Sequence, residues 1–252
     1  MIYLDKGYIG SFDMLNKEAG KQRLREYTGQ LFAAGHKRII APIDGNTWHT
    51  YRLLSWTNGD MPFPMEPQNP LWYNDVYTEL GFAPIMKYRS DKFPIKDIEP
   101  LPYISEVKIR ELSSQGDLPL IHNISVAAFA NNFLYSDLTY MEFAKLYMPV
   151  LSVFDPKLAL IAEINGVPAG FMFSFMYHNN LVLKSMAVLP QFRSKGVGAM
   201  LMNAVLLAGQ KKGATTAIAA LMAEGNNSRK IVEKYNSEKF REYTLYALEV
   251  SS

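Results

Sequence analysis

The sequence predicts a mixed α/β fold in which helices pack against a mixed sheet, and three observations support it. The β-rich runs "LALIAEI" and "VPAGFMFSFMY" flank Asn165-Gly166, a dipeptide that tolerates positive φ at both turn positions and favours a tight hairpin. From Gly196 onward, apolar residues recur at helical spacing, at Val197, Met200, Leu201, Ala204, Val205 and Ala208. Strand-like and helix-like segments then alternate through the rest of the sequence.

The segments after residue 105 follow the order β-α-α-β-β-β-α-β-α-β. "VKIREL" predicts a strand, and "DLPLIHNISVAAFA" predicts a helix with Asp117 at its N-cap and Pro119 in its first turn. "TYMEFAKLYM" predicts a second helix, and "LVLKSMAVL" a strand after the hairpin. The helix from Gly196 ends at Gly213, and "TTAIAAL", "NSRKIVEKY" and "YTLYALEV" predict a strand, a helix and a final strand.

The N-terminal region contains a shorter set of elements. "MIYLDKGYIGSFDML" predicts a hairpin around Lys6-Gly7, "GKQRLREYTGQLFAAG" a helix closed by Gly35, "RIIAPI" a buried strand, and "WYNDVYTELGF" a helix ending at Gly81. Between the last two lies "DGNTWHTYRLLSWTNGDMPFPMEPQNP", which predicts a long loop, and loops of such length are usually functional or mobile.

The Pro-rich, charged segment "DKFPIKDIEPLPY" has the composition of a linker. We therefore expect an N-terminal domain over residues 1–92, a linker over 93–104 and a second domain over 105–252. A weak internal repeat relates the two domains, because a helix, a terminal glycine, an apolar strand and a Tyr-x-x-x-x-Phe pair recur in both. The paired positions are Gly35, Tyr77 and Phe82, and Gly213, Tyr235 and Phe240.

Composition excludes several classes of function. The 252 residues are 48% hydrophobic, enough for a sizeable core, and 26 Lys and Arg against 24 Asp and Glu argue against a nucleic acid or an acidic membrane as partner. Cysteine is absent, so disulfides, thiolate metal sites and cysteine nucleophiles are excluded. The longest apolar run is too short for a transmembrane helix and no signal pattern is found, so we expect a cytoplasmic protein.

The stretch "MAVLPQFRSKGVGAML" places a strand, a glycine-rich turn and a helix in succession. The first amides of a helix lack intrahelical acceptors and carry partial positive charge, so such a junction attracts phosphate. Gly196 and Gly198 remove side chains from the turn, and Arg193 and Lys195 add positive charge beside it. The alternative is an ordinary loop in which the glycines only begin a helix.

Two common phosphate motifs do not match this turn. A Rossmann motif needs a third glycine where the sequence has Leu201, and a Walker loop needs Gly-Lys-Ser/Thr after its second glycine. The pattern Arg-x-x-Gly-x-Gly-Ala after a strand instead resembles the pyrophosphate-binding motif of the GCN5-related N-acetyltransferases (GNAT). "ALIAEINGVPAGFMF" is similar to their central hairpin and "NNSRKIVEKYNSEKF" to their following helix, so the resemblance covers residues 105 to 250.

The resemblance implies the acyl-CoA N-acyltransferase fold, with a complete C-terminal domain preceded by a partial one, and acetyl-CoA as cosubstrate. It implies that the backbone of Met186, Ala187 and Val188 pairs with the pantetheine arm. The Val188 N–H would also polarise the thioester carbonyl. The amides that would surround the pyrophosphate are those of Arg193, Ser194, Lys195, Gly196, Val197, Gly198 and Ala199.

Tyr235 is the candidate general acid, since the family often places a tyrosine at this point to protonate the departing CoA thiolate. The alternative is a tyrosine that packs its ring at a domain face. Two departures from the family pattern are noted. Lys239 replaces the usual glycine before Phe240, and Ser228 stands where an asparagine is usual, with Asn227 one place earlier as the candidate CoA ligand.

A general base is not identified. Glu163, on a predicted strand, could face the cleft, but a glutamate beside a turn is more often solvated. The histidines, His36, His49, His122 and His178, show no metal-ligand spacing, so no metal is expected.

The N-terminal domain resembles the second half of the same fold but lacks the glycine motif, since "NKEAGKQRL" offers one glycine where two are needed. We expect a degenerate half-domain that no longer binds CoA. Its aromatic residues could line a substrate pocket or pack locally; they are Trp48, Trp56, Trp72, Tyr51 and Tyr73.

The leading hypothesis is an acetyl-CoA-dependent N-acetyltransferase that transfers the acetyl group to a primary amine of a small molecule or peptide by direct attack. The alternatives are an inactive acyl-CoA sensor or structural protein on the same fold, and an aminoacyl or peptidyl transferase that uses charged transfer RNA, which the near-neutral charge disfavours. The sequence leaves the acceptor and the oligomeric state open.

Overall fold

The fold is taken from a computed structural model, which describes residues 1–102, 106–113, 115–151 and 154–249. Contacts divide the chain into two compact units, each made of more than one stretch of sequence. The first comprises residues 1–90, 221–226 and 239–252, and the second comprises 91–220 and 227–238. Both units are mixed α/β, as the sequence predicts. The contacts group the last strand with the first unit, which differs from the linear division at residues 93–104.

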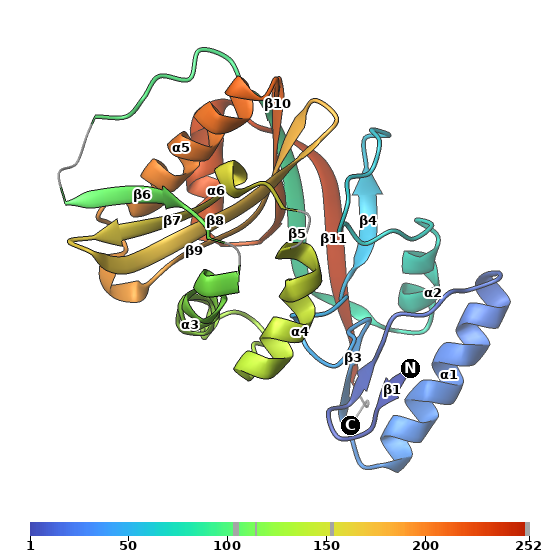
Figure 1. The fold of residues 1–252 in the computed structure, drawn as a ribbon. Coiled ribbons are helices and arrows are strands. Elements are labelled where there is room, and N and C mark those ends of the chain that lie inside the picture. Colours follow the sequence, from blue (N-terminus) through green and yellow to red (C-terminus); the bar gives the residue numbers. More distant parts are fainter. Residues whose placement is uncertain (103–105, 114, 152–153, 250–252) are drawn as a thin grey trace. The chain divides into compact units, whose positions relative to one another are not determined.

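The first unit has a mixed sheet covered by two helices (Figure 1). Its strands follow the order β1-β2-β3-β11, with β2 and β3 parallel and the other neighbours antiparallel, and β4 also pairs with β11. Its strands are β1 (Ile2–Tyr3), β2 (Tyr8–Ile9), β3 (Arg38–Ala41), β4 (Leu53–Thr57), most of β5 (Ala83–Pro94) and most of β11 (Glu238–Glu249). Its helices are α1 (Lys17–Ala33) and α2 (Tyr73–Glu79).

The core of the first unit gathers apolar residues from β2, α1, β3, α2 and β11. Tyr77 lies at its centre, stacked on Tyr246 at 5.5 Å and edge-on to Phe82 at 5.3 Å. The predicted hairpin around Lys6-Gly7 and the helix ends at Gly35 and Gly81 are confirmed, and all three glycines have positive φ.

The second unit contains the elements predicted after residue 105 except the final strand, β11, which the contacts group with the first unit. Its sheet follows the order β10-β9-β8-β7-β6, with β9 and β10 parallel and the others antiparallel. Its strands are β6 (Val107–Glu111), β7 (Ala159–Ile164), β8 (Val167–Tyr177), β9 (Asn180–Val188) and most of β10 (Thr216–Ala223). Its α-helices are α3 (Leu118–Phe129), α4 (Tyr140–Leu151), α5 (Val197–Lys211) and α6 (Asn227–Val232).

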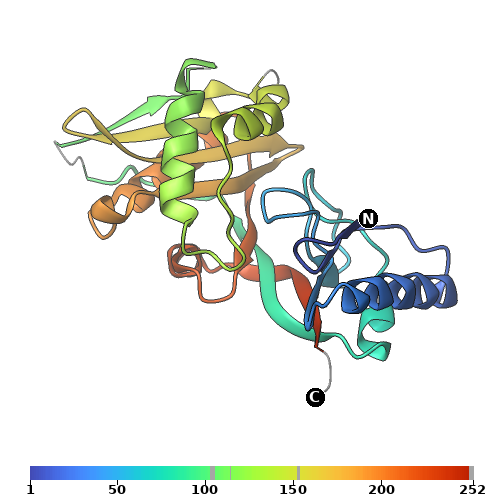
Figure 2. The same ribbon diagram turned by 90° about the horizontal axis from the view of Figure 1, so that it is seen from below.

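Helices cover both faces of this sheet. On one face α3 packs against β8 and β9, and α4 packs against α3, as seen from below in Figure 2. On the other face α5 packs against β7, β8 and β9. The hairpin at Asn165-Gly166 is confirmed, with φ of 50° and 77° at the two turn residues, so the β7–β8 register is fixed where the sequence places it.

Three expectations about strands need correction. The segment predicted as a long loop before α2 contains β4, which pairs with β11. β5 continues to Pro94, into the segment predicted as a linker. β11 begins at Glu238, five residues before the predicted strand. Each reflects pairing with a partner distant in sequence, because β-structure is more sensitive to context than helix propensity.

The remainder of the predicted linker is ordered by α5. The side chain of Asn203 accepts a hydrogen bond from the Leu101 amide at 3.0 Å and donates one to the Glu99 carbonyl oxygen at 2.8 Å. Residues 103 and 104 of this segment lie outside the described part of the chain.

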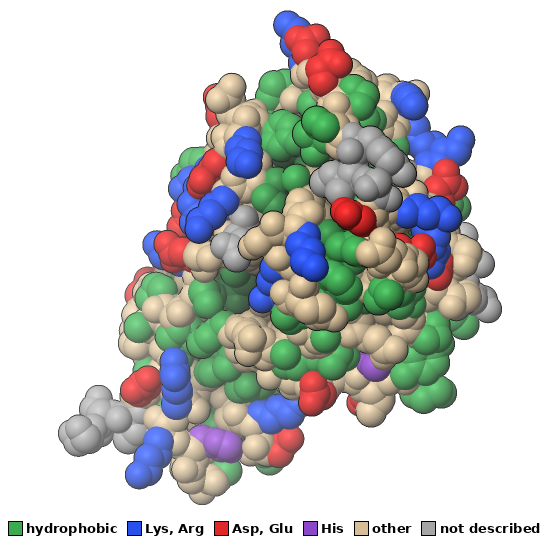
Figure 3. Space-filling model, turned by 90° about the vertical axis from the view of Figure 1, so that its left-hand side faces the viewer, with side chains coloured by type: hydrophobic (Ala, Val, Ile, Leu, Met, Phe, Trp, Pro, Cys, Tyr) green, Lys and Arg blue, Asp and Glu red, His purple; other side chains and the backbone are tan. Residues whose placement is uncertain are grey.

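The surface carries both signs of charge. Lys and Arg side chains alternate with Asp and Glu side chains on the face shown in Figure 3. This mixture agrees with the net charge of +2 and provides no extended basic patch on that face for a polyanion. Among the described residues, every helix is too short or too polar to cross a bilayer.

Candidate functional site

The candidate site lies in the second unit, where β9 and β10 separate. The two parallel strands pair only from Asn180↔Thr216 to Leu183↔Ala219, although both strands continue for several more residues. Beyond Leu183, β9 keeps its partner β8 on one side. The pairing with β10 ends at Leu183, so the end of β9 from Ser185 to Val188 has β8 as its strand partner, and an extended ligand can pair with main-chain groups on its other side.

The end of β9 is shaped by a bulge and by a glycine. A register shift opposite Phe173 and Ser174 leaves Lys184 between two paired positions. Further along, Gly170 of β8 faces Val188, and a Cβ at Gly170 would lie 2.5 Å from the Ala187 carbonyl oxygen. The absence of a side chain at Gly170 therefore lets β8 approach closely and fixes the backbone of Val188.

The turn after β9 leads into the uncapped start of α5. Gly196 occupies the N-cap position with a left-handed φ of 78°, and no side chain caps this helix end. Ser194 is also left-handed, with φ of 64°. Among the described residues, no backbone or side-chain group accepts a hydrogen bond from the amides of Ser194 through Ala199. Six consecutive amides are thus available to an anion at a helix N-terminus.

The two cations of the turn have different surroundings. The Arg193 amide donates to the Pro190 carbonyl oxygen at 3.3 Å, so the available amides begin one residue later than the sequence predicts. The Arg193 guanidinium donates to the Ala128 carbonyl oxygen at 3.0 Å, at the end of α3. Lys195 lies 5.5 Å from the ring centre of Phe192 and is exposed, so its ammonium group can turn toward a ligand.

The start of α5 also meets β9 and α6. A Cβ at Gly198 would contact the Ile231 side chain at 3.5 Å and the Met186 sulfur at 3.7 Å. Gly198 has room for a methyl group, and Gly196 is required for its left-handed φ. Gly198 therefore lies between Met186 of β9 and Ile231 of α6, beside the available amides.

Tyr235 follows α6 in a short 3₁₀ turn and is half-buried. Its ring stacks on Phe93 with centroids 4.9 Å apart and an interplanar angle of 22°. Burial raises the pKa of the Tyr235 phenol, so the hydroxyl stays protonated at neutral pH and can act as a proton donor. Asn227 is the first residue of α6, but its side chain lies outside the described part of the structure.

Glu163 is held by an ion pair. Its Oε1 lies 2.7 Å from Nε of Arg110, and the same guanidinium forms a bidentate pair with Asp117 at 2.7 and 2.8 Å. Asp117 also accepts from the amide and hydroxyl of Ser113. These contacts tie β6, β7 and the start of α3 together, which favours a structural role for Glu163 over that of a general base. Asp117 stands at the predicted N-cap of α3, yet its carboxylate makes no capping bond there.

The corresponding helix of the first unit has a different N-terminus. The side chain of Asn16 caps α1 by accepting from the Ala19 amide at 2.9 Å, and the Gly20 amide donates to the Asn16 carbonyl oxygen at 3.0 Å. Tyr77, the counterpart of Tyr235 in the internal repeat, is 1% exposed. Burial strongly raises the pKa of Tyr77, and its ring is enclosed by the core.

No set of three His, Asp or Glu side chains in the described residues is arranged to hold a metal ion. The histidine of α3 serves packing, because Nε2 of His122 lies 2.7 Å from the Leu138 carbonyl oxygen and the ring contacts Tyr140 and Phe143.

Sequence reasoning missed three features of the site. The left-handed Ser194, the bulge at Lys184 and the stacking of Phe93 on Tyr235 have no local sequence signal. Glycine usually marks a left-handed residue, and Ser194 is not glycine. The bulge depends on strand pairing, and Phe93 is far from Tyr235 in the sequence.

Comparison with known proteins identifies related sequences and folds. Residues 121–235 match the sequence model of the acetyltransferase (GNAT) family. A search of curated proteins by sequence finds no match. The structure is similar to a GCN5-related N-acetyltransferase from Sphaerobacter thermophilus, with a TM-score of 0.65 and 11% identity, covering 92% of this chain and 67% of that one.

Two further solved structures share the fold. A GCN5-related N-acetyltransferase from Kribbella flavida gives a TM-score of 0.54 at 16% identity, over 94% of this chain and 77% of that one. A tandem GNAT protein from the clavulanic acid biosynthesis pathway gives a TM-score of 0.57 at 10% identity, over 95% of this chain and 72% of that one. At these identities the similarity establishes the fold.

Proposed function

We propose that this chain, a member of the GNAT superfamily with a family domain over residues 121–235, is an acetyl-CoA-dependent N-acetyltransferase. Its acceptor is a primary amine of a small molecule or peptide. The observation that carries the proposal is the row of available amides from Ser194 to Ala199 beside the splayed end of β9. This arrangement offers main-chain donors to a pyrophosphate and main-chain pairing to a pantetheine arm.

The remaining residues of the site have roles that follow from this placement. Met186, Ala187 and Val188 pair with the pantetheine arm, and the Val188 N–H stabilises the oxyanion that forms when the amine nitrogen attacks the thioester carbon. The C–S bond then breaks, and the phenol of Tyr235 donates its proton to the departing thiolate. The nitrogen, which is cationic after the attack, loses its proton to water, and water returns a proton to the Tyr235 phenolate. Positioning of the two reactants accounts for much of the rate.

The N-terminal unit has a different part in this proposal. At α1 the Asn16 side chain occupies the Ala19 amide, and Tyr77 is buried, so neither the helix start nor the tyrosine is placed like its counterpart in the second unit. We infer that it is a partial domain that no longer binds CoA.

Two left-handed glycines at opposite ends of α5 provide a matched test of CoA binding. Gly196 and Gly213 have φ of 78° and 87°, and alanine at either position costs about 1–2 kcal/mol of conformational strain. We expect acetyl-CoA at a hundred times its dissociation constant to stabilise the natural chain by about 2.7 kcal/mol. Gly213→Ala should keep this stabilisation, and Gly196→Ala should lose most of it. Equal ligand stabilisation of both variants would contradict the proposed site.

Tyr235→Phe separates a transferase from a sensor. An enzyme loses about 10²-fold or more in kcat with acetyl-CoA binding intact, because general acid catalysis contributes about 10²–10⁴-fold. Thiol release from acetyl-CoA with a panel of amines measures the rate, and calorimetry measures binding. The stacking of Tyr235 on Phe93 is the observation that favours the alternative of a packing residue in an inactive acyl-CoA sensor. In that case no amine supports thiol release and Tyr235→Phe still binds acetyl-CoA.

A further inference from the structure

The first unit contains a buried arginine that forms no ion pair with the described residues. Arg52 immediately precedes β4 and is only 8% exposed. Its Nε and Nη1 atoms are buried, and neither has a hydrogen-bond partner in the described part of the chain. Burying a charged group without a partner is strongly unfavourable, so this arrangement needs an explanation.

Aromatic rings compensate the charge of Arg52 only in part. The guanidinium carbon lies 4.1 Å from the ring centre of Tyr51 and 4.2 Å from that of Tyr88, in the corner formed by two rings at 84° to each other. Ring faces attract a cation, but the guanidinium N–H groups point outward in its own plane. The rings therefore provide electrostatic attraction and leave the hydrogen-bond donors unsatisfied.

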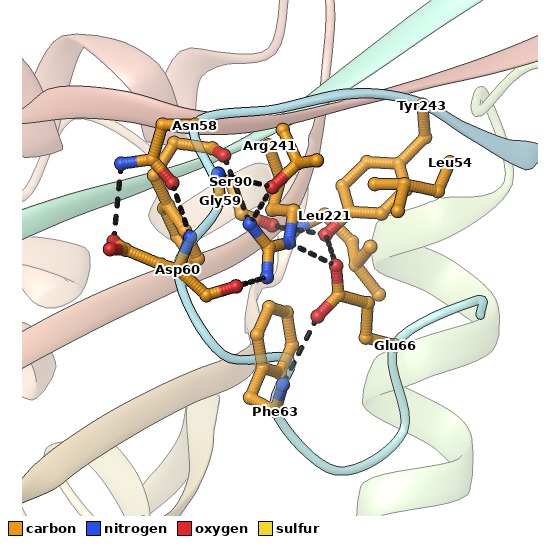
Figure 4. Close-up of polar contacts among 12 residues, drawn as sticks. Leu54, Asn58, Gly59, Asp60, Phe63, Glu66, Ser90, Leu221, Arg241 and Tyr243 are labelled. Carbon is orange, nitrogen blue, oxygen red and sulfur yellow. Dashed lines mark hydrogen bonds and ion pairs between the residues drawn. The ribbon is translucent and has the colours of Figure 1, made fainter. Parts of the chain in front are cut away.

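The nearby buried carboxylate already has its partners (Figure 4). Glu66 Oε1 accepts from Arg241 Nε at 2.8 Å and from the Tyr243 hydroxyl at 3.0 Å, and Oε2 accepts from the Phe63 amide at 3.1 Å. The side chains of Glu66 and Arg241 are 1% and 3% exposed, so they form a closed ion pair. The ring of Tyr243, whose hydroxyl donates to Glu66, lies 6.0 Å from the Arg52 guanidinium, and among the described residues no carboxylate pairs with Arg52.

The backbone of Arg52 is also strained. Its φ is 69°, in the left-handed region that residues other than glycine rarely adopt, and its amide donates to the Pro42 carbonyl oxygen at 2.9 Å. Such strain persists only where the surrounding structure holds it, and it is concentrated at binding and catalytic sites. The strained backbone and the unpaired guanidinium are independent observations on one residue.

We propose that Arg52 is the anchor of a ligand site in the N-terminal unit that takes a singly charged organic carboxylate. Nε and Nη1 are buried donors with no acceptor in the described part of the chain, and a carboxylate bound at the Nη1–Nη2 edge would accept from Nη1 and Nη2 in parallel. One surplus charge between tyrosine rings matches a monocarboxylate better than a phosphate dianion. This site is separate from the acetyl-transfer site and does not depend on the proposed function.

The experiment measures the melting temperature of the full chain at constant ionic strength. Sodium acetate, propionate and benzoate are compared with sodium chloride and inorganic phosphate. We expect a monocarboxylate near saturation to raise the Tm by roughly 5 °C, and chloride and phosphate to have a smaller effect. Arg52→Met should lose this response. Its unliganded Tm should equal or exceed that of the natural chain, because an unpaired buried charge has been removed.

Arg23→Met is the matched control. Arg23 also lies over a tyrosine ring of the first unit, 5.7 Å from the centre of Tyr27, but its side chain is 56% exposed. This variant should respond to carboxylates like the natural chain. Arg52→Lys keeps the charge without the paired donors and should respond more weakly than the natural chain.

Several results would overturn the proposal. They are no carboxylate response in the natural chain, equal responses in Arg52→Met and the natural chain, and stabilisation through Arg52 by phosphate alone. An Arg52→Met variant that is unfolded, or that melts lower while Arg52→Lys restores the Tm, would assign Arg52 to packing between the tyrosines. Circular dichroism establishes whether each variant is folded.

Discussion

A methyl group at Gly170 tests whether the close approach of β8 to β9 positions Val188. A Cβ there would lie 2.5 Å from the Ala187 carbonyl oxygen and 3.2 Å from the Val188 Cα. Ordinary contact begins at 3.4 Å, so the two strands would have to separate by roughly 0.9 Å. Both obstacles are main-chain atoms, so no change of rotamer relieves the clash.

Gly170→Ala should therefore affect both stability and catalysis. Overpacking of this kind costs about 1–3 kcal/mol, which lowers the Tm by about 2–4 °C per kcal/mol in a chain of this size. If Val188 is the oxyanion donor that we propose, a displacement near 1 Å there costs about 10²-fold in rate. Thermal unfolding and thiol release from acetyl-CoA with an accepted amine measure the two effects.

A control variant separates this effect from that of any glycine substitution. Gly29 lies in α1, and a Cβ added there would have no neighbouring atom within 4 Å. Gly29→Ala should therefore be neutral or stabilise by up to about 1 kcal/mol without changing the rate. If Gly170→Ala melts like the natural chain and turns over at the same rate, the reasoning about strand approach is refuted.

Two further predictions concern buried charge. In the second unit, the Arg110 guanidinium lowers the pKa of Asp117 from 3.8 to about 2, with help from Ser113. This shift contributes about 1–2 kcal/mol to the free energy of unfolding above pH 4, and the contribution is lost as the pH falls toward 2. Asp117→Asn should remove this pH dependence. Acid denaturation measures it, and an unchanged curve for the variant would contradict the prediction. In the first unit, Arg241→Met leaves Glu66 buried without its cation and should destabilise the chain by about 3–5 kcal/mol in urea unfolding, while a loss under 1 kcal/mol would show that the pair is dispensable.

Local signals in the sequence predicted most elements of the second unit. Asn165-Gly166 needs left-handed φ at both positions, and Gly196 and Gly213 mark the ends of α5 for the same reason, so these predictions depend only on short-range sterics. The strands β4, β5 and β11 were missed or shortened, because their pairing depends on residues far away in the chain. The buried pair of Glu66 and Arg241 was missed likewise, since 175 residues separate its members.

The N-termini of α1 in the first unit and α5 in the second differ at a single residue, the N-cap. At α1, the Asn16 side-chain oxygen accepts a hydrogen bond from the Ala19 amide, as asparagine commonly does at an N-cap. At α5, Gly196 has no side chain to supply, and its backbone is left-handed. A side chain therefore caps the start of α1, and no side chain caps the start of α5, where we propose that a pyrophosphate binds. A glycine at an N-cap costs only a few tenths of a kcal/mol relative to asparagine, so leaving these amides uncapped lowers the free energy of unfolding only slightly.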